Sequence, residues 1–233
     1  MNEKGFSIKE YFENAYYDDA TRFRELTRLD SNDMIRYNEL LQELKIVHDP
    51  GSKTSENSTV YKGQALEEIV TFLIKRSCIF DVVANIRSST NEIDQTLELN
   101  HIGIDLKKFI KLPGDLFLSE CKNYNKKVDV TWIGKFYSLL AHNHAKLGIL
   151  FSYKGFTGQG WNDGVGLVKK IYLLKEDINE KVYIIDINKK DFELISEGES
   201  LIGIIHAKIK ALRLDTDFKK FLLSNHPAME NET

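Results

Sequence analysis

Apolar and polar positions along the chain follow two periods, one typical of helices and one typical of strands. Residues 63–77 carry apolar side chains at helical spacing, which predicts an amphipathic helix. Alternating or continuous apolar runs then predict three strands, over residues 80–86, 92–99 and 116–122. A further helix is expected over residues 131–146, followed by a buried strand at 148–151, a short uncharged run bounded by glycine. The predicted order is therefore helix, three strands, helix, strand.

Polar and turn-forming stretches divide the chain into four parts. Residues 48–60 are polar and turn-forming, with Pro50-Gly51 followed by several Ser and Thr residues, which predicts a linker. Residues 1–47 contain helix-capping and helical patterns, so we expect a helical N-terminal segment there. The α/β pattern occupies residues 61–213, with one more strand and flanking helices in its second half, and residues 214–233 are expected to form a C-terminal tail.

The composition is that of a globular protein. The chain has 233 residues, of which 42% are apolar, and this is enough to fill a core. It has no run of 18 apolar residues and no apolar stretch at its start, so we expect a soluble, cytoplasmic protein. Cys78 and Cys121 are too few for a disulfide framework, and both are expected to be reduced core residues.

The formal charge limits the ways in which this protein could bind nucleic acid. A net charge of -3 disfavours a protein that coats nucleic acid nonspecifically, because that mode depends on neutralising many phosphates. It allows an enzyme with a local basic channel. Lysine clusters that could line such a channel include Lys126 and Lys127.

Three charged residues on two of the predicted strands carry the candidate chemistry. Asp94 lies on one strand, and Glu120 and Lys122 lie two residues apart on the next, so both project from one face while Cys121 points to the other. Phosphodiester hydrolysis needs an activated water and neutralisation of phosphate charge, and a divalent metal supplies both. Mg²⁺ is held by only one or two carboxylates, so Asp94 and Glu120 would suffice as its anchor. The Lys122 ammonium can stabilise developing negative charge.

This arrangement resembles the PD-(D/E)xK nuclease superfamily, in particular its restriction-endonuclease-like proteins of the Mrr type. Three segments carry the resemblance: Gly63-Gln-Ala-Leu-Glu67 on the first helix, Ile93-Asp94 on the second strand and Ser119-Glu-Cys-Lys-Asn-Tyr124 on the third. The resemblance covers about residues 60–195 and implies an α/β fold with a restriction-endonuclease-like core in the order αβββαβ, a mixed sheet flanked by helices. The chain departs from the pattern in having no proline before Asp94 and a glutamate at position 120, where Mrr-type proteins commonly have glutamine.

The resemblance also implies roles for individual residues. Asp94, Glu120 and the main-chain carbonyl of Cys121 would bind Mg²⁺, with Mn²⁺ as a substitute, and Lys122 would be catalytic. A helix glutamate would complete the site, and we favour Glu67 for its distance from the start of the motif. The helical wheel alone leaves Glu68 open as the alternative.

The function implied is that of a metal-dependent endonuclease that hydrolyses DNA, in restriction or defence. The N-terminal segment could contact DNA through Arg22 and Arg24, mediate a homodimer, or pack on the core, and a partner defence protein is a further possibility. Two alternatives stay open. One is a non-cleaving nucleic-acid-binding or assembly module of the same fold, and the other is a nuclease for RNA or branched DNA, because the metal site does not select the form of the substrate.

Overall fold

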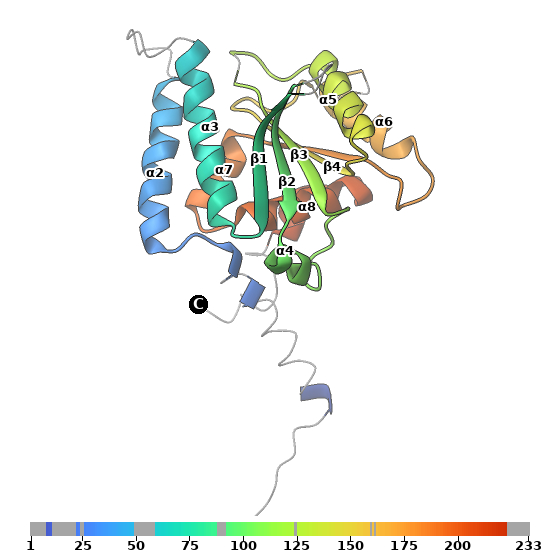
Figure 1. Ribbon diagram of the computed structural model, residues 1–233, viewed down its shortest axis with the longest axis horizontal. Helices are drawn as coiled ribbons and strands as arrows, with labels where there is room; N and C mark the ends of the chain where they lie inside the picture. Colours follow the sequence, from blue (N-terminus) through green and yellow to red (C-terminus); the bar gives the residue numbers. More distant parts are fainter. Residues whose placement is uncertain are drawn as a thin grey trace, which may run out of the picture.

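A five-stranded mixed sheet forms the centre of the molecule (Figure 1). The computed structural model describes residues 8–10, 22–23, 26–48, 59–87, 92–123, 125–158, 160 and 162–222. The strands lie in the order of the sequence: β1 (Phe80–Arg87), β2 (Glu92–Leu99), β3 (Leu116–Cys121), β4 (Leu147–Phe151) and β5 (Tyr183–Ile187). The first three pair antiparallel, and β3, β4 and β5 pair parallel, so the carboxyl ends of these three strands meet at one edge.

Helices flank both faces of this sheet. They are α2 (Ser31–Ile46), α3 (Thr59–Arg76), α4 (His101–Leu106), α5 (Val130–His142), α6 (Gly164–Leu173), α7 (Lys189–Ser196) and α8 (Leu201–Leu214), and the 3₁₀ helix η2 (Phe218–Phe221) follows them. Side-chain oxygens close several of the N-termini, for example Asp129 on α5 and Ser200 on α8. The order α3, β1, β2, β3, α5, β4 confirms the predicted α/β core. No helix within the described ranges is long and apolar enough to cross a membrane.

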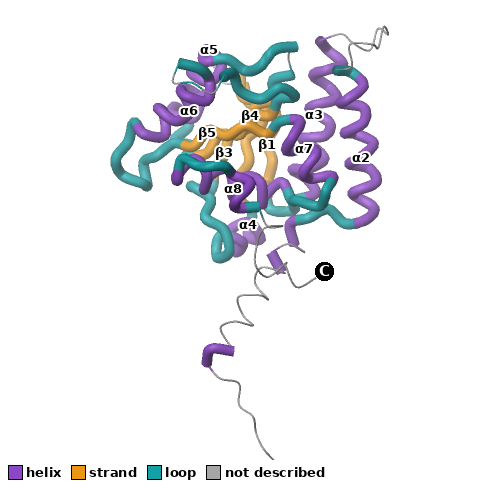
Figure 2. Tube along the Cα trace, turned by 180° about the vertical axis from the view of Figure 1, so that it is seen from behind, coloured by secondary structure: helices purple, strands orange, loops and turns teal. Residues whose placement is uncertain are grey.

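Two hydrophobic clusters separate the faces of the sheet. Leu118, Leu150 and Ile184 point to α5 and α6, whereas the alternate residues of the same strands point to α3, α7 and α8. The tube view from behind shows α7 and α8 across the second face (Figure 2). The fold is therefore a three-layer α/β/α arrangement, as expected for a sheet whose parallel strands are buried on both sides.

Helix α2 belongs to the same core as the sheet. Its buried face consists of Tyr37, Leu40, Leu41 and Leu44, which join the cluster that covers the α3 side. The Tyr37 hydroxyl donates to the main-chain oxygen of Phe192 on α7 over 2.7 Å. Of the roles considered for residues 1–47, the described part thus shows packing against the α/β domain.

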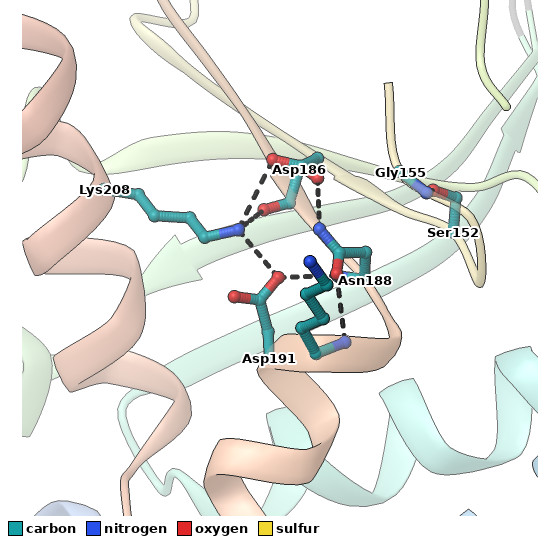
Figure 3. A network of polar contacts seen from close by, with 7 residues as sticks. Ser152, Gly155, Asp186, Asn188, Asp191 and Lys208 are labelled. Atoms are coloured by element: carbon teal, nitrogen blue, oxygen red, sulfur yellow. Dashed lines mark hydrogen bonds and ion pairs between the residues drawn. The ribbon is translucent and has the colours of Figure 1, made fainter. Parts of the chain in front are cut away.

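A buried polar network fixes the carboxyl end of β5 (Figure 3). Lys208 of α8 contacts Asp191 Oδ2 at 2.7 Å and Asp186 Oδ1 at 3.4 Å, and Asn188 caps α7 beside them. Burial alone would lower the pKa of Lys208, but the two carboxylates outweigh it and raise that pKa. The network therefore joins β5, α7 and α8 at the edge where the strands end.

The structure departs from the sequence-based expectations in three places. Helix α4 was not predicted, because six residues are too few to show a helical period. The expectation for Cys78 is wrong, since this residue is exposed, with φ of 56° just after α3 ends. Helix α3 begins at Thr59, inside the predicted linker, and residues 49–58 of that linker lie outside the described residues.

The contact between β4 and α5 gives a direct test of this packing. A Cβ added at Gly148 would lie 2.5 Å from Phe136 Cε1 and 2.7 Å from Leu140 Cδ1. We expect Gly148→Ala to destabilise the protein by about 1–3 kcal/mol, measured by urea unfolding, because the core must shift to admit the methyl group. Gly134→Ala on α5 is the control, since a Cβ there meets nothing within 4 Å. It should be neutral or stabilising by up to about 1 kcal/mol. Equal effects at both positions would contradict the described packing.

Candidate active site

The register between β2 and β3 brings Asp94 and Glu120 together. The antiparallel ladder pairs Gln95 with Ser119, and one more step along it sets Asp94 opposite Glu120 on the same face. At this point the side chain of Asp94 replaces the ladder, because its Oδ2 accepts the main-chain N–H of Cys121 at 3.0 Å. This bond fixes the Asp94 carboxylate at the end of β3.

Lys122 lies between the two carboxylates. Its ammonium forms a direct ion pair with Glu120 Oε1 and is 3.8 Å from Asp94 Oδ2. The ring of Trp132, at the start of α5, lies 5.0 Å from the same nitrogen, a distance suited to a cation–π contact. Only 13% of the Lys122 side chain is exposed, so its position is set by the protein rather than by solvent.

Glu120 is the carboxylate whose burial in this group is least well compensated. Its side chain is 10% exposed, and burial raises its pKa, with Lys122 opposing that effect and Asp94 adding to it. Its Oε2 is buried and has no hydrogen-bond partner among the described residues. An unpaired buried carboxylate oxygen is unfavourable, and it is the kind of ligand that a hard divalent cation prefers. The donor set formed with Asp94 therefore fits a divalent metal ion.

The structure separates the two candidate helix glutamates, although both are exposed. After burial and Asp94, the charge of Glu67 contributes to the raised pKa of the Cys121 thiol, whose side chain packs on the α3 side of the sheet. Glu68 instead lines a cavity of about 460 Å³ beside α2. No group of three or more His, Cys, Asp or Glu side chains in the described ranges is close enough to hold a metal ion. Within these ranges Glu67 therefore does not form a metal-binding cluster with Asp94 and Glu120.

The other predicted site residues lie as follows. Cys121 packs its side chain against the α3 face of the sheet, opposite to Glu120. Lys126 and Lys127 are exposed on the loop between β3 and α5, and Lys126 lies 4.0 Å from Asp129 Oδ2. Arg22 is exposed on a short helical fragment, and Arg24 lies outside the described residues.

The loop that follows β3 is held by residues that the sequence did not single out. Asn123 donates through Nδ2 to the main-chain oxygen of Lys62 on α3, and its Oδ1 is 2.8 Å from His48 Nε2. The His48 ring stacks on Tyr153 with 3.8 Å between centroids. These residues come from four separate segments, so no spacing in the sequence could have revealed that they meet.

Comparison with known families agrees with this geometry. The model of the family described as "Mrr_cat: Restriction endonuclease" matches residues 61–177, which is 117 of the 233 residues. No curated protein and no solved structure gives a significant match. The matched region begins on α3 and includes Asp94, Glu120 and Lys122, as the resemblance noted in the sequence predicted. The chain belongs to the Mrr_cat restriction endonuclease family.

Proposed function

We propose that this protein is a Mg²⁺-dependent endonuclease that hydrolyses phosphodiester bonds in DNA, acting in the cytoplasm in defence against foreign DNA. Family membership supports nuclease chemistry. The observation that carries the proposal is the convergence of Asp94, Glu120 and Lys122 at the carboxyl end of β3. All three groups that the chemistry requires are present, which favours cleavage over a module that only binds.

The carboxylates of Asp94 and Glu120 would hold the metal ion, Mg²⁺ or its substitute Mn²⁺. The buried, unpaired Oε2 of Glu120 supports this assignment. The main-chain carbonyl of Cys121 and the side chain of Glu67 would complete the ligand set. When bound, the ion supplies a more acidic coordinated water and neutralises charge on the phosphate.

Lys122 would act on the phosphate itself. Its ammonium is held by Glu120 on one side and by the ring of Trp132 on another, so it is fixed before substrate arrives. A preorganised cation stabilises charge that develops on the phosphate oxygens without further rearrangement. Trp132 thus serves as a positioning residue for the catalytic lysine.

Replacement of Lys122 tests the catalytic proposal. Purified wild-type protein should cut DNA with Mg²⁺ or Mn²⁺ and fail to cut with EDTA. Lys122→Ala should lower the rate by at least about 100-fold, because a positioned charge that stabilises the transition state is lost. Lys111→Ala is the control, since this exposed lysine lies just before the opposite end of β3. Gel assays of plasmid and linear DNA measure the rates.

The same assay should include single-stranded DNA, branched DNA and RNA. Preference for RNA or for branched DNA would replace the proposed substrate while retaining the chemistry. The enzymatic proposal fails if the wild type shows no metal-dependent cleavage beyond that of Lys122→Ala on any of these substrates.

Metal binding can be measured without substrate. Because burial raises the pKa of Glu120 in the folded state, its ionisation weakens the metal-free fold as pH rises through that pKa, and a bound cation offsets this loss. At pH 7.5, Mn²⁺ at 100 times its Kd should stabilise the wild type by about 2.7 kcal/mol, seen as a higher melting temperature. Asp94→Asn and Glu120→Gln should remove this response.

Glu98→Gln provides the matched control for that measurement. Glu98 is exposed on the same strand as Asp94 but pairs with Leu116, at the far end of β3. Its variant should respond to Mn²⁺ as the wild type does. A response in Glu120→Gln equal to that in Glu98→Gln would show that the ion binds elsewhere.

A further inference from the structure

We propose that Lys62 and Lys154 form a second phosphate-binding position, which holds the DNA strand at a phosphate next to the scissile one. Lys62 lies in the first turn of α3, and Lys154 lies on the loop after β4. The proposal rests on the function proposed above and adds residues that contact the substrate outside the metal site.

The two ammonium groups converge on one residue of the loop after β3. Lys62 Nζ donates to Asn125 Oδ1 over 2.7 Å, and Lys154 Nζ donates to the main-chain oxygen of Asn125 over 2.7 Å. Asn125 follows Lys122 by three residues. Two positive charges from separate elements are therefore placed together beside the end of β3.

Neither the buried Lys62 nor the exposed Lys154 has the carboxylate partners that other lysines in the described part of the chain have. Lys62 is 9% exposed, yet within the described residues neither it nor Lys154 contacts a carboxylate. Lys122 and Lys208, by contrast, each contact two carboxylates. A largely buried ammonium with only neutral acceptors is unfavourable, so an anion brought by the substrate would complete this position.

The position adjoins the metal site. Asn123, the residue after Lys122, donates to the main-chain oxygen of Lys62. The charges of both lysines also act on His48, whose pKa is lowered mainly by burial, against the hydrogen bond with Asn123, and further by Lys62 and Lys154. A strand whose scissile phosphate lies at the metal would pass this positive region.

The chemistry selects a phosphate of the DNA backbone rather than a base. Lysine ammonium groups bind phosphate as point charges, and backbone contacts of this kind fix the register of the nucleic acid without reading its sequence. Lys126, which had been expected to contact DNA, is 75% exposed and lies near Asp129. Lys62 and Lys154 are held in place by Asn125 and are better suited to fix the strand.

The salt dependence of DNA binding distinguishes a phosphate contact from a purely structural role. Affinity of the full-length protein for a duplex oligonucleotide is measured by fluorescence anisotropy in EDTA, so that cleavage does not interfere. The logarithm of the binding constant falls linearly with the logarithm of the salt concentration. Each lost phosphate contact should make this slope less steep by about 0.9. For the double variant Lys62→Met/Lys154→Met, we therefore expect a slope that is less steep by about 1.8. Its binding to DNA should also be at least tenfold weaker at about 0.1 M salt.

Three further variants separate the loss of a phosphate contact from misfolding and from a change in net charge. Lys154→Met alone changes an exposed side chain, so it should fold normally and lower the slope by about 0.9. Lys62→Arg keeps the charge and should bind DNA with the wild-type slope. The control, Lys111→Met with Lys146→Met, removes the same charge from a basic cavity lined by both residues at the other end of the sheet and should leave the slope unchanged.

The outcomes separate this inference from the proposed function. If the wild type cuts DNA but Lys154→Met and the double variant keep its salt slope, the inference is overturned and the nuclease proposal stands. An equal reduction of the salt-dependence slope in the control pair would also overturn the inference, because the effect would then follow net charge alone. If the wild type neither binds nor cuts DNA in any buffer, both proposals fail.

Discussion

The antiparallel pairing of β2 with β3 is the constraint on which the candidate site depends. Because side chains alternate along a strand, a shift of one residue would turn Asp94 away from Glu120 and toward the opposite layer. The pairing is fixed by Leu97, which is fully buried, and by its neighbour across the ladder, Phe117. The bond from the Cys121 N–H to Asp94 then ends the ladder at the site itself. Core packing and site geometry thus depend on one register.

The fold contains two clusters of one lysine with two carboxylates, and their surroundings differ. Both leave one carboxylate oxygen buried without a hydrogen-bond partner in the described ranges, on Glu120 and on Asp191. In the Lys208 cluster, the side chains of Lys208, Asp191 and Asp186 are 8%, 1% and 23% exposed, and Figure 3 shows these residues meeting between β5 and two helices. In the Lys122 cluster, 34% of the Asp94 side chain is exposed. The first cluster joins β5, α7 and α8, whereas the second lies at the end of β3 and leaves Asp94 more open to solvent.

Sequence patterns were sufficient for the core elements and for the prediction that Asp94, Glu120 and Lys122 lie close together. The strand that carries Asp94 alternates apolar and polar residues, and the strand that leads to Glu120 and Lys122 is an apolar run, so both could be located from the sequence. The helical wheel could not choose between Glu67 and Glu68, because that choice depends on where α2 packs against α3. Contacts such as those of Lys62 with Asn125 join distant segments, and no local pattern encodes them. Cys78 was misplaced because free cysteines are usually buried, whereas this one follows the end of a helix at positive φ.

The central claim is that Asp94 and Glu120 share a divalent metal ion beside Lys122. Anomalous diffraction from crystals of the protein soaked in Mn²⁺ tests it most directly. The account predicts a peak between these two carboxylates, within the short coordination distances of a hard cation to oxygen. A peak at another group of residues, or none under conditions where the same protein cuts DNA with Mn²⁺, would contradict it.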